Sequence, residues 1–364
     1  MKSIRIVFLF ILFALFCSVG WAVSYPLFHS SNRILEDAHF AFDCGDYGTA
    51  LRLAEDAKIT RRQEVQECMD VLDQSLKPFA VQKAGDVVFD VRAVLLERDV
   101  FDAVEMIDYL LDLKGEEYFD NSIAKIRSYI ERKKIFPETN YLIARVYEFE
   151  GEYELSHSYY MEAWQHSDVL DIPDMKYSIL YDMANLSYNF SRLDESEKAL
   201  LLVVAEDPFF SDSAFTNAIL SSVRRGYSVD KIFNLYRTNC YRSIPAFFRL
   251  AELYAEQSKT EDAFTVALFG VLTAFTRMHE IVDNRTTEFE YTSLDDFFKT
   301  AMKHDDIMEW SISNDFWRCI YRLAELGKQL YPNNELFGKE LLAVIASTAP
   351  ENYWKQLALS KLFN

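Results

Sequence analysis

Glycine and proline are scarce in this sequence, which holds 10 glycines and 8 prolines in 364 residues. β-Sandwiches and barrels need many Gly- and Pro-rich turns, so this scarcity argues against them and favours long helices joined by short turns. Half of the residues are apolar, which is enough to bury a sizeable core. With 29 Phe and 21 Tyr, the rings are expected in the seams between packed helices. We therefore predict an all-α protein.

Motifs of the common catalytic classes are also missing. The sequence has no P-loop, no dinucleotide-binding glycine fingerprint, no H-E-x-x-H and no G-x-S-x-G. Its six histidines are scattered, and the nearest approach to a metal pattern is His304-Asp305-Asp306. Consecutive residues of a helix point about 100° apart, so these three do not converge on one ion. We predict neither an enzyme nor a bound cofactor or metal.

Positive charge is in short supply as well. The chain has 38 Lys and Arg against 57 Asp and Glu, a formal net charge of −19. An acidic surface repels phosphate backbones, which argues against nucleic acid and favours a partner with a basic surface. One basic run is interpreted as the solvated face of a helix, with a docking patch as the alternative. It consists of Lys125, Arg127, Arg132, Lys133 and Lys134.

The cysteines form no C-x-x-C pair, and Cys17 lies in the N-terminal segment. The other four are Cys44, Cys68, Cys240 and Cys319. They fall on helical patterns and are expected to be buried free thiols. Disulfides are the alternative, because the chain has the features of an exported protein.

The N-terminal segment predicts export. Lys2 and Arg5 precede eleven apolar residues, 6–16, and a small-x-small exit follows at Gly20 and Ala22. This is the order of a cleavable signal peptide. We expect the body of the protein in the periplasm or at the outer face of the inner membrane, that is, in the cell envelope.

Two rival interpretations keep the chain at a membrane. Residues 6–28 contain no charge, and these 23 residues are enough for an uncleaved transmembrane anchor with Trp21 and Tyr25 at the interfaces. A lipid-modified Cys17 is a further alternative, although the bulky Phe16 precedes it. Residues 1–28 are therefore assigned to a signal peptide or an N-terminal membrane anchor.

A helix-turn-helix pattern recurs along the rest of the chain. The clearest copy lies at 141–163, where Ala144 and Tyr147 belong to a first helix, Gly151 ends it, and Tyr153 opens a second helix that continues to Ala163. Glycine at the helix end suits the left-handed conformation found there. Small residues at helical spacing allow the two helices to approach closely.

These residues resemble the tetratricopeptide repeat (TPR), a 34-residue helix pair with small and aromatic residues at matching offsets. Further copies lie near residues 38–57, 180–208 and 247–270, with fainter ones at 99–104 and 324–334. The resemblance implies a right-handed α-solenoid of stacked antiparallel helix pairs, a TPR-like superhelix. We assign residues 31–283 to these repeats and residues 314–364 to a C-terminal repeat with capping helices.

Residues 284–313 do not fit the repeat length. A polar turn is followed by a capping box, Ser293 to Asp296, which predicts the start of a helix containing Phe297, Phe298, Met302 and Met308. We interpret the segment as an inserted or capping element.

The resemblance implies a non-catalytic scaffold that binds a protein or peptide in the concave groove of the array. Groove residues should lie on the first helix of each pair, and the candidates are Asn140, Arg145, Asn185, Tyr188 and Arg249. The alternative is a carrier, or a transporter-associated protein, that holds a small solute or lipid in an apolar, aromatic-lined channel of the array.

Overall fold

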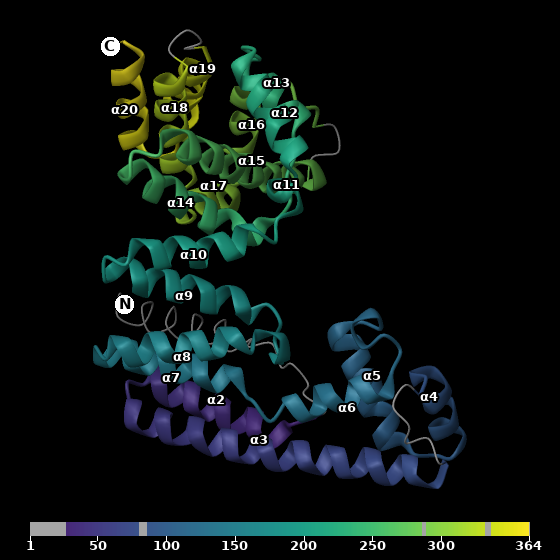
Figure 1. Cartoon of the computed structure of the whole chain (residues 1–364). Coiled ribbons are helices and arrows are strands. Elements are labelled where there is room, and N and C mark those ends of the chain that lie inside the picture. The colour runs from purple at the N-terminus through teal and green to yellow at the C-terminus, as the bar shows by residue number, and fades with distance from the viewer. Residues whose placement is uncertain (1–26, 80–85, 286–288, 332–335, 364) are drawn as a thin grey trace, which may run out of the picture. The chain divides into compact units, whose positions relative to one another are not determined.

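The computed structural model describes residues 27–79, 86–285, 289–331 and 336–363 (Figure 1). Over these residues the chain is helical, and the β-type contact is an isolated bridge between Val87 and Ser122. The prediction of an all-α protein is confirmed. The predicted signal peptide or anchor, with Cys17, lies outside the described residues except for Leu27 and Phe28.

The chain forms two compact units, Met1–Met175 and Lys176–Asn364. Unit 1 contains the first seven described helices and three short 3-10 turns. The helices are α2 (His29–Asp43), α3 (Tyr47–Leu76), α4 (Val88–Glu97), α5 (Phe101–Lys114), α6 (Ile123–Arg132), α7 (Pro137–Glu150) and α8 (Tyr153–Gln165), and the 3-10 turns are η1 (Lys77–Phe79), η2 (Glu117–Phe119) and η3 (Ser167–Val169).

Unit 2 contains the remaining helices. They are α9 (Met175–Asn189), α10 (Leu193–Val204), α11 (Pro208–Ser211), α12 (Ser213–Arg224), α13 (Val229–Leu235), α14 (Ile244–Glu256), α15 (Thr260–Arg285), α16 (Leu294–Ala301), α17 (Asp305–Ser313), α18 (Phe316–Leu330), α19 (Leu336–Thr348) and α20 (Asn352–Leu362), with the 3-10 turn η4 (Tyr241–Ser243) before α14.

One turn geometry joins several successive helices. A residue with φ between 57° and 81° ends the first helix, and the second helix begins two residues later; this residue is Gly45, Asp99, Gly151, Ser191 or Ser258. The residue between them donates its N–H to a carbonyl five positions earlier, as Glu152 does to Tyr147 at 2.8 Å. These bonds satisfy carbonyls that a helix end otherwise leaves unpaired. The left-handed helix end predicted at Gly151 is confirmed.

Consecutive helices pack against each other in α2–α3, α7–α8, α14–α15 and α18–α19. Small residues make this packing close. Ala50 and Ala54 of α3 and Ala163 of α8 are fully buried. A Cβ atom on Gly270 of α15 would lie 2.7 Å from the ring of Phe248 on α14, so only glycine fits there.

Helix α3 connects two hydrophobic cores of unit 1. Its first half, including Ala50 and Ala57, packs in a core with α2 and α7. Its second half, including Val65 and Leu72, packs in a core with α4, α5 and α6. The continuous helix to Leu76 explains why the repeat spacing is lost after Ala57.

Unit 2 contains the long apolar helix α15 and the helix start predicted at Ser293. Helix α15 is long and apolar enough to cross a membrane by length and composition, but 72% of its most apolar window is buried, and it packs as the core helix of unit 2. The predicted cap at Ser293 is confirmed, since Ser293 Oγ accepts from Asp296 N at 3.1 Å. The Asp296 carboxylate accepts from Thr292 Oγ1, so among the hydrogen bonds of the described residues the capping box is shown by its Ser293 half. The helix it opens ends at Ala301, however, and Met308 belongs to a second helix, α17.

Candidate functional site

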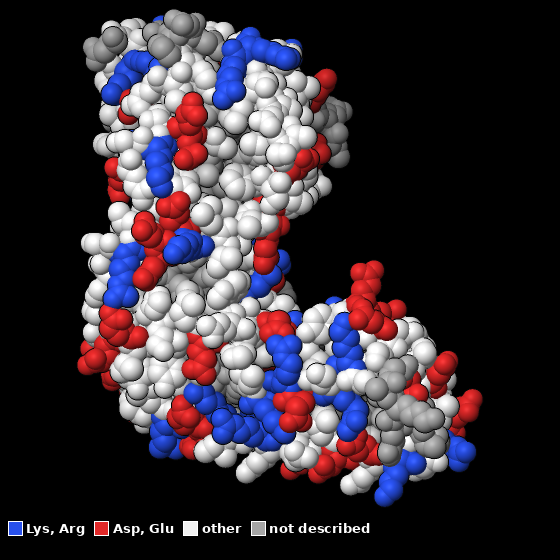
Figure 2. Space-filling model, viewed as in Figure 1, with Lys and Arg blue, Asp and Glu red and all other residues white. Residues whose placement is uncertain are grey.

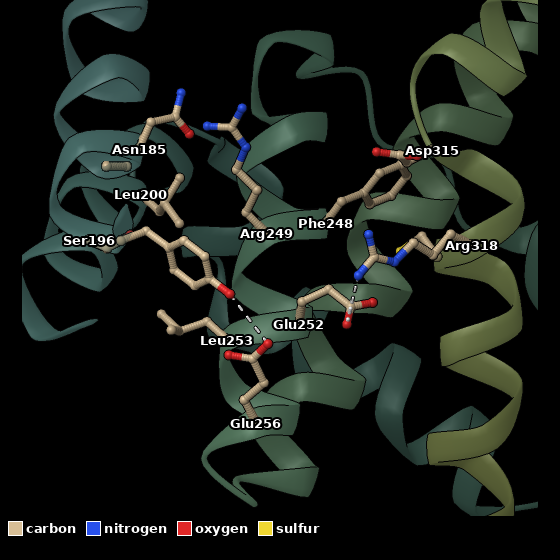
Figure 3. Close-up of a pocket in the computed structure, with 13 residues that line it drawn as sticks. Asn185, Ser196, Leu200, Phe248, Arg249, Glu252, Leu253, Glu256, Asp315 and Arg318 are labelled. Carbon is tan, nitrogen blue, oxygen red and sulfur yellow. Dashed lines mark hydrogen bonds and ion pairs between the residues drawn. The ribbon is translucent and has the colours of Figure 1, made fainter. Parts of the chain in front are cut away.

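A cavity of about 270 Å³ lies within unit 2 between α9, α10, α14 and the first turn of α18 (Figure 3). Its apolar part is formed by Ala184, Leu200, Phe248 and Leu253, which are buried residues of α9, α10 and α14. Polar side chains from α9, α14 and α18 surround this part. The cavity therefore combines an apolar floor with a polar rim, which is the usual composition of a binding site.

Two hydrogen-bonding side chains face each other across the rim. The amide of Asn185 on α9 and the guanidinium of Arg249 on α14 point toward one another in Figure 3. Arg249 is exposed, and its guanidinium carbon lies 5.3 Å from the ring centre of Tyr181. Among the residues that the structure describes, no carboxylate forms an ion pair with Arg249. This part of the rim can therefore donate hydrogen bonds to a ligand.

On the other side of the rim Glu252 and Arg318 are already paired, whereas Asp315 forms no ion pair among the described residues. Glu252 of α14 accepts from Arg322 Nη2 at 3.0 Å and lies 3.4 Å from Arg318 Nη2. Tyr188 donates to Glu256 Oε1 at 3.4 Å, a long hydrogen bond. The Glu252 contacts brace α14 against α18, and the Tyr188 contact joins α9 to α14. The Asn185–Arg249 side is left free.

Three of the five candidate groove residues line this cavity: Asn185, Tyr188 and Arg249. Asn140 and Arg145 belong to unit 1. Asn140 is only 3% exposed and lies in the buried N-terminal half of α7. The prediction that Asn140 lines an open groove is therefore wrong. Arg145 is half-buried, with its guanidinium 4.5 Å from the ring centre of Phe42.

Some lining residues were not predicted. Glu252 lies three positions after Arg249 and four after Phe248 on α14, so helical spacing could have indicated Glu252 from Arg249, and Phe248 from Glu252. Arg318 and Asp315 come from the start of α18, more than sixty residues later in the chain. Nothing in the sequence indicated that this turn reaches α14.

A second polar cluster lies wholly inside unit 1. Arg61 of α3 donates from Nη2 to Asp171 Oδ2 at 2.7 Å, and Lys133 donates from Nζ to Asp171 Oδ1 at 2.5 Å. None of these three side chains is more than 2% exposed. The prediction that the basic run forms a solvated face is therefore wrong for Lys133, which is buried. The other four members of the run are partly exposed and pair with Asp120, Asp73, Asp168 and Glu131.

The environment of Arg61 fixes the start of α2. Its guanidinium lies between two rings, 4.5 Å from the centre of Phe28 and 3.7 Å from that of Phe136. It also donates to Ser31 Oγ at 2.8 Å and to Asn32 Oδ1 at 2.9 Å. A planar guanidinium can stack flat on rings while it donates hydrogen bonds from its edge.

Glu138 completes the cluster. Its Oε1 accepts from the backbone N–H of Asp171 at 2.5 Å, while Oε2 is buried without a hydrogen-bond partner in the described structure. Burial and the charge of Asp171 raise the pKa of Glu138 to about 7, against the opposing charges of Lys133 and Arg61. Burial alone would raise the pKa of Asp171, but the two cations and their hydrogen bonds outweigh it and hold that pKa well below its usual range.

The four described cysteines are free thiols, as predicted, but only Cys319 is fully buried; Cys44 is exposed. Burial raises the pKa of the Cys319 thiol well above its ordinary value, which makes it a poor nucleophile. In the part of the chain that the structure describes, no group of three His, Cys, Asp or Glu is placed to hold a metal ion.

Known proteins with similar sequences include two uncharacterized ones. A protein of Treponema pallidum (strain Nichols) is 29% identical over 298 residues, which cover 81% of this chain and 80% of the relative. A protein of Borreliella burgdorferi (strain ATCC 35210 / DSM 4680 / CIP 102532 / B31) is 22% identical over 225 residues, 56% of this chain and 69% of the relative. No protein-family model matches the chain, and no solved structure matches it significantly. The relatives bear no functional name, so function has to be argued from the cavity.

Proposed function

We propose that this protein is a non-catalytic scaffold of the cell envelope that holds a segment of a partner protein in the cavity of unit 2. The observation that carries the proposal is the free Asn185–Arg249 pair above an apolar floor. An extended or helical segment offers carbonyl or carboxylate oxygens to the pair, and one apolar side chain enters the floor between Leu200 and Phe248. Neither step requires a nucleophile, a general base or a metal.

The size of the cavity supports a side chain as its occupant. About 270 Å³ falls just below the range of about 300–1,000 Å³ that is usual for small-molecule sites. The charged rim also differs from the apolar, aromatic-lined channel that a carrier would need. In the core of unit 2 the rings fill space by packing on each other, as Phe247, Phe210 and Phe269 do. The carrier remains the alternative that the experiment below can detect.

The architecture we propose is a TPR-like, right-handed α-solenoid. It is supported by three successive left-handed helix ends, Ser191, Gly226 and Ser258, which lie 35 and 32 residues apart, close to the TPR period of 34. The next helix begins two residues after Ser191 and Ser258 and three residues after Gly226. It is also supported by the small residues at the helix-pair interfaces. Location in the envelope rests on Lys2, Arg5 and the apolar run that follows them.

The proposal is tested by native mass spectrometry of the protein extracted gently from its own envelope, as wild type and as two variants. Arg249→Ala removes the free guanidinium of the rim. Arg277→Ala is the matched control, because Arg277 is also an exposed arginine of unit 2 that stacks on a tyrosine, 4.9 Å from the ring centre of Tyr241, and it does not line the cavity.

We expect the additional mass of one polypeptide on the wild type and on Arg277→Ala, and its loss from Arg249→Ala. Because the chain is acidic, the complex should dissociate more readily as salt rises. An additional mass of a few hundred daltons would favour the carrier. A bare chain in every preparation would contradict the scaffold.

A further inference from the structure

Three aromatic rings meet at one end of unit 1, where the α2–α3 turn lies beside the end of α7. Phe149 is 5.3 Å from Phe42 and 6.0 Å from Tyr47 between ring centres, and Phe42 is 5.7 Å from Tyr47. We call these three residues the turn patch. Phe42 is buried and Tyr47 is half-buried, but Phe149 is 64% exposed. In the turn patch, the packed rings of Phe42 and Tyr47 therefore support the Phe149 ring, which is exposed to solvent.

The exposed apolar surface continues along the chain from Phe149. Every residue from 149 to 155 is exposed, and this stretch includes Tyr153 and Leu155. Single exposed apolar residues are ordinary on protein surfaces, whereas contiguous ones mark sites of interaction. Here an exposed ring stands on two other rings, next to two further exposed apolar side chains.

Carboxylates surround the turn patch. Asp43 and Asp46 lie in the α2–α3 turn, and Glu150 and Glu152 flank Gly151 in the α7–α8 turn; all four are exposed. Asp46 caps α3 by accepting from Thr49 N. Within the described residues, Asp43, Glu150 and Glu152 form no ion pair. Figure 2 shows acidic side chains gathered at this end of α7 and α8.

Two cations lie in this region: Arg52 is near Asp46 but pairs with Asp56 at 2.9 Å, and Arg145 faces inward. The guanidinium of Arg145 is stacked 4.5 Å from the ring centre of Phe42 and does not neutralise the rim. An apolar centre with a negative rim excludes several occupants by charge. Anionic lipid headgroups and nucleic acid are repelled, and a second copy of the same patch would place like charges opposite each other.

We propose that the turn patch is a second docking surface, separate from the cavity of unit 2, and that it binds a protein segment with an aromatic or aliphatic side chain flanked by lysine or arginine. The apolar side chain covers Phe149, and the flanking cations lie against the carboxylates of Asp43, Glu150 and Glu152. Charge complementarity selects this occupant, and the exposed ring supplies its apolar contact.

The test is selection of a displayed random peptide library on the full-length protein, followed by fluorescence anisotropy with the enriched peptides at low and high salt. Four variants are compared with the wild type, one of them the cavity variant Arg249→Ala. Phe149→Ser removes the exposed ring, Glu150→Lys with Glu152→Lys reverses the rim, and Phe363→Ser is the control. Phe363 is 85% exposed and lies in unit 2. Because the altered side chains are exposed, the variants should fold, and circular dichroism checks this.

We expect enriched peptides that carry an aromatic or aliphatic residue beside Lys or Arg, with affinity that falls as salt rises. Phe149→Ser should weaken their binding at least tenfold, the rim reversal should abolish it, and Phe363→Ser should leave it unchanged. Enrichment of neutral or acidic peptides would overturn the proposal, as would no enrichment. Binding to Phe149→Ser that equals binding to the wild type would also overturn the proposal, because the peptides would then bind outside the turn patch. Loss of binding in Arg249→Ala would overturn it as well, because the peptides would then bind in the cavity of unit 2. Flotation of the protein with zwitterionic vesicles that depends on Phe149 would assign the patch to a membrane instead.

Discussion

Replacing Asp171 by asparagine should destabilise unit 1 and leave unit 2 unaffected. The substitution keeps the shape of the side chain but removes the negative charge that faces Arg61 and Lys133. Removing one partner of a buried ion pair typically costs about 3–5 kcal/mol, because the remaining charge stays buried without compensation. We expect about 3 kcal/mol here, since the asparagine oxygen still accepts one hydrogen bond.

Glu138 is a second reason to expect the lower end of this range. With Asp171 neutral, Glu138 loses the neighbouring negative charge that raises its pKa, so it ionises more readily and balances part of the buried positive charge of Arg61 and Lys133. The assay is hydrogen exchange followed by mass spectrometry at pH 7, which reports each unit separately. About 3 kcal/mol corresponds to exchange roughly 100-fold faster in the most protected peptides of α3 and α7.

The control for this prediction is Asp168→Asn, three residues away. Asp168 pairs with Arg132 at 2.5 Å, but the two side chains are 41% and 43% exposed. Exposed pairs contribute about 0–1 kcal/mol, so exchange should hardly change. The reasoning is refuted if Asp171→Asn resembles this control, or if α14 and α15 lose protection as much as α3 does.

Three further outcomes follow from the geometry. Because the pKa of Glu138 is raised to about 7 in the folded chain, unit 1 should lose on the order of 3 kcal/mol of stability as pH rises from about 4.5 to 7, and urea unfolding of Glu138→Gln should lack this slope. Gly270→Ala would place a Cβ 2.7 Å from the Phe248 ring and should cost about 1–3 kcal/mol in the thermal unfolding of unit 2 while weakening partner binding; unchanged unfolding would show that the ring moves freely. Gly151→Ala meets open space but keeps φ at 81°, so it should cost about 1–2 kcal/mol, and a smaller loss would mean that the turn relaxes.

Local features of the fold were predictable from sequence because they depend on neighbours in the chain. The helix end at Gly151 and the cap at Ser293 follow from the conformations and hydrogen bonds that these residues favour, and both predictions are confirmed. The buried alanines of α3 follow from helical spacing in the same way. These signals indicate where helices begin and end and which face is apolar.

Features that depend on distant residues could not be predicted. Lys133 belongs to a basic run that reads as a solvated face, yet it is buried because Asp171, 38 residues later, accepts its hydrogen bond. Asn140 was assigned to an open face, but one residue on a helix corresponds to a rotation of about 100°, so a small error in register places it in the core. Asn185 and Arg249 were found as individual candidates, whereas their position across one rim depends on the packing of α9 near α14.

The central claim, that the cavity of unit 2 holds a partner segment, is tested most directly by a photo-crosslinking amino acid placed at Tyr188 on its rim. The same residue at Tyr353, an exposed position of α20, is the control. Irradiation in the native envelope should join one polypeptide to the chain at position 188, and Arg249→Ala should remove this product. No product at position 188, or the same products from position 353, would contradict the claim.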